Sequence, residues 1–333
     1  MKKIKIAING FGRIGRAAFK IALTHPDLEV VAVNDLSDTS ILAHLLRHDS
    51  VYGHFKPMVE VEKDALIVDG KKVKFFAIKN PADSPWKDLG VDVVLECTGV
   101  FRSKDSAGGH LTAGAKKVIL SAPAKDKDIK TFVLGVNDHE YNGETIINNA
   151  SCTTNCVAPV MAVLMENFGV KKALLSTVHS YTADQNLIDG SHKDLRRARG
   201  AAINIVPTST GAATATAETL PELLGKFDGL SLRVPTPVVS LSDFSVLLAK
   251  NATKEEVNAA LIKASKSPKF KGILDVTDEP VVSSDMIANP HSSIVDLSLT
   301  QVVDGDLLKV ISWYDNEWGY ANRLVEMVKI VSV

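Results

Sequence analysis

One short segment of this 333-residue chain limits the possible folds more than any other: INGFGRIG, in which Gly10, Gly12 and Gly15 form the pattern G-x-G-x-x-G. It follows an apolar, β-branched run at residues 4–8 and precedes a helical pattern from residue 13 to about residue 24. A strand, a glycine-rich turn and a helix in this order begin a dinucleotide-binding βαβ unit. The segment therefore predicts a parallel sheet with helices on its faces.

The three glycines and one acid have separate expected roles. Gly10 permits a tight turn, Gly12 lets the backbone approach a pyrophosphate, and Gly15 allows the helix to pack closely on the strand. Asp35 ends the next strand candidate, about 20 residues further on, where a carboxylate accepts hydrogen bonds from the adenosine ribose. A carboxylate there also repels the additional phosphate of NADP, so the sequence favours NAD. The alternative is a glycine turn followed by an unrelated surface aspartate.

The pattern of strands and helices changes near the middle of the chain. Apolar runs at residues 29–35, 91–99 and 116–123 continue the alternation of a parallel α/β sheet. After about Asn149 the runs are longer and alternate in polarity, as in LSLRVPTPVVSLSDFSVLLA, which is typical of an antiparallel sheet covered on one face. We therefore expect an α/β domain, a boundary near residue 150, an α+β domain and a C-terminal helix.

Charge and cysteine content argue against several classes of protein. The 38 Lys and Arg side chains nearly balance the 39 Asp and Glu, so neither nucleic acid nor an anionic membrane is an expected partner. The start MKKIKIAINGFGRIG lacks the apolar core of a signal peptide, and no run approaches a membrane span, so we expect a cytoplasmic protein. Three cysteines, Cys97, Cys152 and Cys156, are too few for a disulfide framework.

The segment INNASCTTNCVAP contains two of these cysteines and permits three interpretations: a nucleophile, half of a metal site, or two buried structural thiols. Zinc needs more ligands, and the chain offers no second cysteine pair and only the remote Cys97. Cys152 lies among Ser and Thr residues that favour a helix start, and an apolar helical run follows. Because the first turn of a helix experiences the positive end of the dipole, we expect a lowered pKa for Cys152 but not for Cys156.

A base or a cation normally accompanies a thiolate nucleophile. The segment LLSTVHSYTADQ places His179 at the end of an apolar strand, where a polar loop begins, and scaffolds commonly present a catalytic group at such a position. The alternative is a strand-end histidine that is bonded only to the backbone. These residues by themselves do not establish that Cys152 and His179 meet.

Eight segments occur in one order along the chain: INGFGRIGR, ECTGVF, SCTTNCVAP, HSYTADQ, HKDLRRAR, PTSTGAA, RVPTP and WYDNEWGYANR. Together they resemble the family of phosphorylating glyceraldehyde-3-phosphate dehydrogenases, from residue 4 to the C-terminus. The resemblance implies a Rossmann-type NAD-binding domain at residues 1–150 and a catalytic domain with a mostly antiparallel sheet at residues 151–315. It also implies a C-terminal helix at residues 316–333 that packs on the first domain, and a homotetramer.

The resemblance further implies a reaction, the oxidative phosphorylation of D-glyceraldehyde 3-phosphate to 1,3-bisphosphoglycerate with reduction of NAD, as in glycolysis or gluconeogenesis. Cys152 would form a hemithioacetal with the aldehyde, a hydride would pass to the nicotinamide, and inorganic phosphate would cleave the resulting thioester. His179 would raise the thiolate fraction as an ion-pair partner and act as general base.

The resemblance also assigns further site residues beside those already derived from the glycine pattern, and no metal site is expected. Thr182 and Arg233 would hold the phosphate group of the substrate. The residues that would hold inorganic phosphate are Ser151, Thr153, Arg197, Thr210 and Gly211. The residues that would bind the cofactor are Asn9, Gly10, Gly12, Arg13, Ile14, Gly15, Asp35, Ser121 and Asn316.

Two places depart from the usual family pattern. Gly190 and Ser191 replace a leucine and a proline of many NAD-linked members, and small polar residues there resemble members that accept NADP, because in the tetramer this loop approaches a neighbouring subunit's ribose. We therefore expect NAD to be preferred, with a weakened rejection of NADP. Thr214 stands where lysine is common. Three alternatives stay open: an erythrose-4-phosphate dehydrogenase of the same architecture, a semialdehyde dehydrogenase, and a non-catalytic NAD-binding interaction protein.

Overall fold

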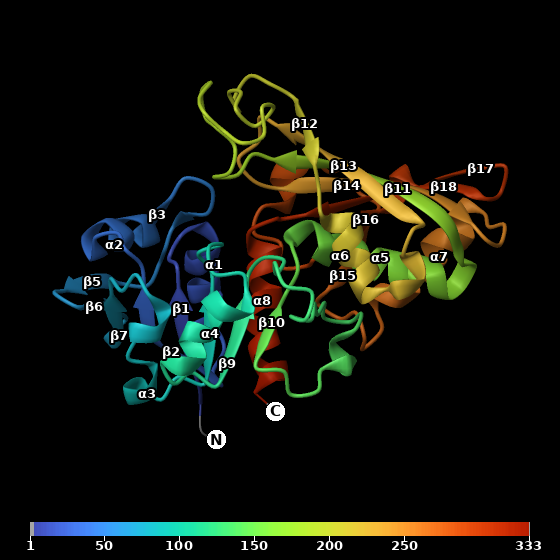
Figure 1. The fold of residues 1–333 in the computed structure, drawn as a ribbon. Coiled ribbons are helices and arrows are strands. Elements are labelled where there is room, and N and C mark those ends of the chain that lie inside the picture. The colour runs from blue at the N-terminus through green and yellow to red at the C-terminus, as the bar shows by residue number, and fades with distance from the viewer. Residues whose placement is uncertain (1–2, 333) are drawn as a thin grey trace. The chain divides into compact units, whose positions relative to one another are not determined.

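A computed structural model describes residues 3–332 of the chain. The chain divides into two compact units, whose elements are labelled in Figure 1. The first unit contains the chain up to Phe132, Asp138–Ala150 and the segment that begins at Ala321, and the second contains Val133–Asn137 and Ser151–Tyr320. Residues 1, 2 and 333, which the expected domain ranges include, lie outside the described residues.

An eight-stranded sheet forms the centre of the first unit, in the order β10-β9-β8-β1-β2-β7-β6-β5. Neighbouring strands from β10 to β7 are parallel, whereas β7, β6 and β5 pair in antiparallel fashion. The strands are β1 (Ile4–Asn9), β2 (Leu28–Asn34), β5 (Val59–Glu62), β6 (Ala65–Val68), β7 (Lys71–Phe76), β8 (Val93–Glu96), β9 (Lys117–Leu120) and β10 (Ile146–Asn148), and a separate pair is β3 (His48–Asp49) with β4 (Gly53–His54). The predicted parallel sheet is confirmed, and the antiparallel strands at its edge were not predicted.

The helices of this unit are α1 (Arg13–Ala22), α2 (Thr39–Arg47), α3 (Trp86–Leu89), α4 (Lys104–Thr112) and, from Ala321 onward, α8 (Trp318–Val331). In α8 the apolar side chains of Leu324, Val325 and Val328 are buried, as a helix with one apolar face requires. Lys329 at its end forms an ion pair with Asp27 at 2.8 Å. The last helix is thus part of the core of the first unit.

The second unit contains a sheet with the order β12-β13-β11-β14-β18-β16-β15, and β17 pairs with β18. Its strands are β11 (Val170–Ser180), β12 (Val206–Ser209), β13 (Phe227–Val234), β14 (Ser240–Leu248), β15 (Leu274–Thr277), β16 (Ser293–Asp296), β17 (Gln301–Val303) and β18 (Leu307–Tyr314). Only β11 with β13 and β15 with β16 are parallel among these pairs. The prediction of a mostly antiparallel sheet is confirmed.

Three helices cover one face of this second sheet: α5 (Cys152–Phe168), α6 (Ala212–Thr219) and α7 (Lys254–Ser265). Figure 1 shows them packed along that face. Strand β14 alternates strictly between buried and partly exposed residues, because only alternate side chains reach the helices. On the other face, Leu174, Leu230 and Leu307 are 63%, 45% and 47% exposed. Of the helices within residues 3–332, none combines the length and the apolar character that a bilayer span requires.

Candidate active site

The first turn of α5 carries the cysteine of the SCTTNC segment. Ser151 is the N-cap, and its Oγ accepts a hydrogen bond from the backbone N–H of Thr154 at 3.1 Å. Cys152 is the first residue of the helix, which continues to Phe168 although it contains Pro159. The predicted helix start is confirmed, and Cys152 lies where the backbone N–H groups of the helix point outward.

Cys152 and His179 are in contact. The Cys152 Sγ lies 3.5 Å from Nε2 of His179, which is buried near the end of β11. The other ring nitrogen, Nδ1, lies 2.7 Å from the carbonyl oxygen of Ser180. Because a carbonyl oxygen only accepts hydrogen bonds, Nδ1 carries the hydrogen, and in the neutral ring Nε2 presents a lone pair to the thiol. Both interpretations of His179 therefore apply: the backbone holds one nitrogen, and the other faces the thiol.

Burial shifts the pKa values of both members of this pair toward the uncharged forms. Burial and the nearby Arg233 guanidinium lower the pKa of His179 to about 3. Burial also raises the pKa of the Cys152 thiol, although Arg233 and hydrogen bonds with Thr153 act in the opposite direction. The expectation that the helix terminus lowers this pKa is therefore wrong in its net direction, because desolvation is the larger effect. Burial therefore favours the uncharged form of each group, whereas the expected ion pair would need the attraction between them to exceed this effect.

Arg233 lies beside this pair and is a candidate for binding an anion. Arg233, on β13, donates from Nη1 to the carbonyl oxygen of Ser180 at 3.2 Å and to Thr182 Oγ1 at 3.1 Å. Its Nε is buried and has no hydrogen-bond partner among the described residues. A buried donor in this condition is destabilising unless a ligand accepts its hydrogen, and a guanidinium group favours phosphate oxygens. Thr182 and Arg233 therefore lie together in an arrangement that suits a phosphate group.

Arg197 supplies a second guanidinium group close to the first. Burial lowers the pKa of Arg233, and the charge of Arg197 lowers it further. Nε of Arg197 donates to Thr208 Oγ1 at 3.0 Å, and its Nη1 pairs with Asp184. Arg197 also pairs with Asp194, so its charge is partly balanced, and Arg233, whose Nε is buried, is the guanidinium group with a donor left for an anion.

Three other residues expected to bind inorganic phosphate differ in whether a hydrogen-bond donor is left for a ligand. Gly211 is the N-cap of α6, and no atom lies within 4 Å of where a Cβ would stand. Thr210 Oγ1 accepts a hydrogen bond from the N–H of Ala212 at 3.2 Å, which leaves its own hydrogen for a ligand. Thr153, in contrast, is buried, and its Oγ1 lies 2.9 Å from Oη of Tyr314. Sequence reasoning missed Tyr314, because WYD does not distinguish an active-site tyrosine from a core tyrosine.

Asn316 follows β18 and has a fixed amide orientation. Its Oδ1 accepts hydrogen bonds from Ser180 Oγ at 2.9 Å and from Ser240 Oγ at 3.1 Å. With Oδ1 on the side of the two hydroxyl groups, the opposite side of the amide presents the Nδ2 donors. Such a group suits a carboxamide oxygen, and NAD, the cofactor expected for Asn316, carries a carboxamide on its nicotinamide ring.

The glycine-rich turn of the first unit borders a cleft of about 420 Å³. Gly10 has φ +93°, and a Cβ there would lie 2.7 Å from the backbone nitrogen of Thr98. A Cβ on Gly15 would lie 2.0 Å from the carbonyl oxygen of Gly10, whereas a Cβ on Gly12 would meet nothing within 4 Å. Gly10 and Gly15 are therefore required by the fold itself, and Gly12 leaves open space where a pyrophosphate could approach the backbone.

Asp35 lines the same cleft and also holds the turn. Its Oδ2 accepts a hydrogen bond from the N–H of Phe11 at 2.7 Å, and Oδ1 accepts one from the N–H of Ser37 at 2.9 Å. Carboxylate oxygens accept more than one hydrogen bond, so ribose hydroxyls can bind there as well. Leu36 and Val100, each 64% exposed, give the cleft apolar surfaces for an adenine ring. The carboxylate acceptor, the open glycine and the apolar walls fit NAD.

Asn9 lines this cleft, but its side chain is buried and bonded within the protein. It is 2% exposed, and its amide bonds to Glu96 on one side and to Asn34 on the other. Sequence reasoning missed Asn34 and Glu96, although both end strands of the parallel sheet, where ligands of such folds bind. The other expected cofactor residues lie at the start of α1 (Arg13 and Ile14) and directly after β9 (Ser121).

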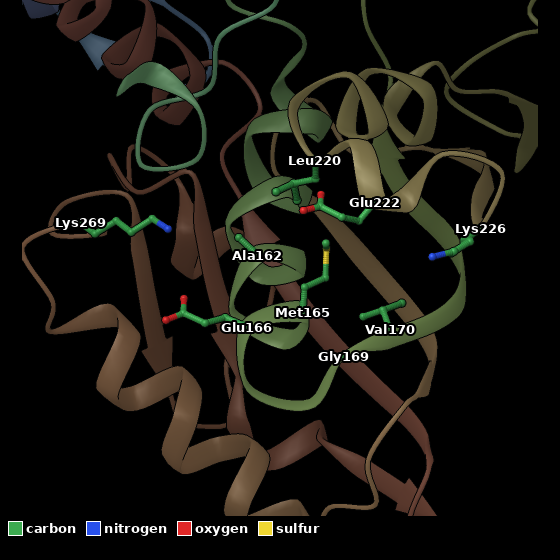
Figure 2. Close-up of a pocket in the computed structure, with 9 residues that line it drawn as sticks. All are labelled: Ala162, Met165, Glu166, Gly169, Val170, Leu220, Glu222, Lys226 and Lys269. Atoms are coloured by element: carbon green, nitrogen blue, oxygen red, sulfur yellow. The ribbon is translucent and has the colours of Figure 1, made fainter. Parts of the chain in front are cut away.

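A hollow of about 450 Å³ at the far end of α5 is separate from these residues. Figure 2 shows its lining: Ala162, Met165, Glu166, Gly169, Val170, Leu220, Glu222, Lys226 and Lys269. Its four charged side chains belong to exposed residues, and none of the nine residues is a cysteine or a histidine. Among residues 3–332, no group of three or more His, Cys, Asp or Glu side chains is arranged to hold a metal ion.

Comparison with known proteins covers both units. Residues 4–104 match the model of the glyceraldehyde 3-phosphate dehydrogenase NAD binding domain, and residues 151–316 match that of the C-terminal domain. Relatives named glyceraldehyde-3-phosphate dehydrogenase from Mycolicibacterium smegmatis, Streptomyces coelicolor and Mycobacterium tuberculosis are 55%, 54% and 56% identical to this chain. Each alignment covers 98% of this chain and 98% of the relative.

Proposed function

This chain belongs to the glyceraldehyde-3-phosphate dehydrogenase family, and we propose that its second unit oxidises glyceraldehyde 3-phosphate on Cys152 while its first unit binds NAD. The protein is an NAD-dependent oxidoreductase. The observation that carries the assignment of Cys152 is its 3.5 Å contact with Nε2 of His179, beside a buried Arg233 Nε that has no partner among the described residues. A nucleophile, a base and an anion site then lie together.

The contact between Cys152 and His179 determines how the covalent steps begin. The Cys152 sulfur bonds to the aldehyde carbon as Nε2 of His179 accepts the thiol proton, and transfer of that proton to the former carbonyl oxygen completes the hemithioacetal. Oxidation to the thioester removes a hydride from carbon and a proton from the hydroxyl, and His179 accepts this proton. NAD, when bound, supplies the hydride acceptor. An oxygen of inorganic phosphate then attacks the thioester carbon, and the Cys152 sulfur leaves and recovers its proton from His179.

Two phosphate groups need separate donors. We propose that Arg233, through its Nε, and Thr182 hold the substrate phosphate. We propose that the residues for inorganic phosphate are Ser151, Thr153, Arg197, Thr210 and Gly211. Within this second set, Thr153 would contribute its backbone N–H at the start of α5, because its hydroxyl is bonded to Tyr314.

The cofactor residues have distinct proposed tasks. The open backbone at Gly12 and the first turn of α1, with Arg13 and Ile14, would hold the pyrophosphate. Asp35 would accept hydrogen bonds from the ribose. Asn316 would donate from Nδ2 to the carboxamide of the nicotinamide, since its oxygen is already bonded to two serines.

A homotetramer is the quaternary structure that we propose. The open face of the second sheet exposes Leu174, Leu230 and Leu307, and the loop that follows β11 exposes further apolar side chains. Those in the loop are Leu187, Ile188, Leu195, Ile203 and Ile205. Apolar patches of this kind mark surfaces that other chains cover. Light scattering should therefore report the mass of four chains, and a mass of one chain would contradict the proposal.

Steady-state formation of NADH tests the proposed reaction. We expect a higher kcat/KM for glyceraldehyde 3-phosphate than for erythrose 4-phosphate, each with NAD and inorganic phosphate. Replacement of the nucleophile, Cys152→Ser, should lower kcat at least about a thousandfold. The matched control is Cys156→Ser, since Cys156 is fully buried and donates to Ser293 Oγ, away from the reacting atoms. A preference for erythrose 4-phosphate, or full activity of Cys152→Ser, would contradict the proposal.

A further inference from the structure

A row of buried amide and carboxyl groups crosses neighbouring strands at the cleft of the first unit. Glu96 ends β8, Asn9 ends β1 and Asn34 ends β2, and these strands are neighbours in the sheet. Nδ2 of Asn9 donates to Oε2 of Glu96, and Nδ2 of Asn34 donates to Oδ1 of Asn9 at 2.7 Å. Oδ1 of Asn34 accepts a hydrogen bond from the backbone N–H of Ile78, just after β7, at 2.8 Å. The row thus connects the carboxyl ends of the strands, where ligands of such sheets bind.

The carboxyl group of Glu96 ends this row and is surrounded by donors. Besides Asn9, Nε2 of His110 lies 3.0 Å from Oε2, and the backbone N–H and the hydroxyl group of Thr98 donate to Oε1. The indole N–H of Trp86 donates to Nδ1 of His110 at 3.0 Å, so Nδ1 accepts and Nε2 carries the hydrogen. Both oxygens of Glu96 therefore act as acceptors, and an amide in this place would turn its own N–H groups toward other donors.

We propose that Glu96 is a positioning residue for NAD, because it holds the glycine turn against the loop that follows β8. Oε2 holds Asn9, the residue before Gly10, and Oε1 holds Thr98. Gly10 packs so closely on this loop that a Cβ would lie 2.7 Å from the backbone nitrogen of Thr98. These three residues line the cleft, whereas Glu96 is 2% exposed and acts through them.

The same carboxylate fixes the direction in which each amide of the row points. Since Nδ2 of Asn9 is bonded to Glu96, Oδ1 of Asn9 faces Asn34. Asn34 then directs Nδ2 to this oxygen, which leaves its own oxygen for the N–H of Ile78. Asn34 and Ile78 line the same cleft. The inference rests on the proposed function only in that NAD binds in this cleft.

Titration with NAD and with ADP tests the proposal, because ADP carries the adenosine and pyrophosphate parts without the nicotinamide. Glu96→Gln keeps the shape of the side chain but replaces one acceptor oxygen with a donor. It should therefore raise the Kd of NAD and the Kd of ADP by the same factor, about tenfold. In steady-state assays with glyceraldehyde 3-phosphate, KM for NAD should rise and kcat at saturating NAD should not change, as expected when only cofactor binding is weakened.

A variant that is only less stable should not show this pattern. Leu66→Ala is the control, because Leu66 is fully buried on β6. Its truncation should lower the unfolding temperature and leave the Kd of NAD unchanged. If Glu96→Gln does not fold, two variants of His110 replace it. His110→Phe removes the donor to Oε2 and should raise the Kd of NAD, whereas His110→Gln keeps a donor near the position of Nε2 and should raise it less.

An unchanged Kd of NAD in Glu96→Gln would overturn the proposal, and so would an equal rise in Leu66→Ala. A fall in kcat with an unchanged KM for NAD would show that Glu96 only supports the fold. Equal Kd values in His110→Phe and His110→Gln would also decide against the proposal. Turnover of glyceraldehyde 3-phosphate by the unmodified protein tests the proposed function separately, because the titrations involve no sugar phosphate.

Discussion

His179 donates from Nδ1 to the carbonyl oxygen of the next residue, Ser180, at 2.7 Å, and this bond decides which nitrogen faces Cys152. The base is thus oriented by the strand that carries it. Because the ring is buried beside Arg233, its pKa falls to about 3. The nitrogen without a hydrogen, Nε2, therefore faces the thiol.

The same histidine should make the protein sensitive to acid. Its pKa is 6.5 in an unperturbed chain and about 3 in the folded protein, so between these values the unfolded state binds one more proton. The free energy of unfolding then falls as pH falls, by up to about 1.4 kcal/mol per pH unit. Thermal unfolding of His179→Gln should therefore shift less on acidification than that of the unmodified protein. The control is His139→Gln, since His139 is exposed, and its unfolding temperature should shift on acidification as that of the unmodified protein does. An equally large shift in His179→Gln and in the unmodified protein would contradict this prediction.

Replacement of Arg233 should affect only a phosphorylated substrate. Arg233→Lys removes Nε and the planar arrangement of donors, so KM for glyceraldehyde 3-phosphate should rise about 10- to 100-fold. The measurement is steady-state kinetics with glyceraldehyde 3-phosphate and, as the control, glyceraldehyde. Glyceraldehyde has no phosphate group, and its KM should not change. An equal rise for both substrates would show that Arg233 does not hold the phosphate.

Two glycines of one motif should respond differently to the same change. In Gly15→Ala the added Cβ would meet the Gly10 carbonyl oxygen, so unfolding should be easier by about 3 kcal/mol or more. Gly12 has an ordinary φ of −71° and open space around it, so Gly12→Ala should unfold like the unmodified protein. Its affinity for NAD should nevertheless fall roughly tenfold, since the methyl group occupies the path of the pyrophosphate. Denaturant unfolding and NAD titration separate these effects, and unaltered NAD affinity in Gly12→Ala would place the pyrophosphate elsewhere.

The charge of Asp35 should control the choice between NAD and NADP. We expect kcat/KM to be higher for NAD than for NADP in the unmodified protein. In Asp35→Asn the ratio of the two kcat/KM values should fall about tenfold, because the carboxylate no longer repels the additional phosphate of NADP. Asparagine still offers an oxygen to the N–H of Phe11. Asp38→Asn removes an exposed charge three residues away and is the control. If both variants narrow the ratio equally, general charge and not Asp35 is responsible.

Local chemistry allowed much of the site to be predicted. The glycine turn, the helix that begins at Cys152 and the histidine at a strand end depend on a few consecutive residues, and all occur where the sequence indicated. Turn conformations and helix caps are determined by neighbours in the chain, so they can be recognised without knowledge of the tertiary contacts.

Features that arise from packing were not predictable in this way. The raised pKa of Cys152 results from burial by elements that come from distant parts of the sequence, and it reverses the effect expected from the helix end. Tyr314 is far from Thr153 along the chain, and only the packing of α5 on the sheet brings their two hydroxyls together. Desolvation and buried hydrogen bonds of this type depend on the complete fold.

The grouping of α8 with the first unit has a consequence for biosynthesis. The side chains of Leu324, Val325 and Val328 belong to the core of that unit, yet they follow the whole second unit along the chain. The growing polypeptide can therefore complete the core of its nucleotide-binding half only after the second unit has been translated, and a product that terminates before α8 would lack this part of the core.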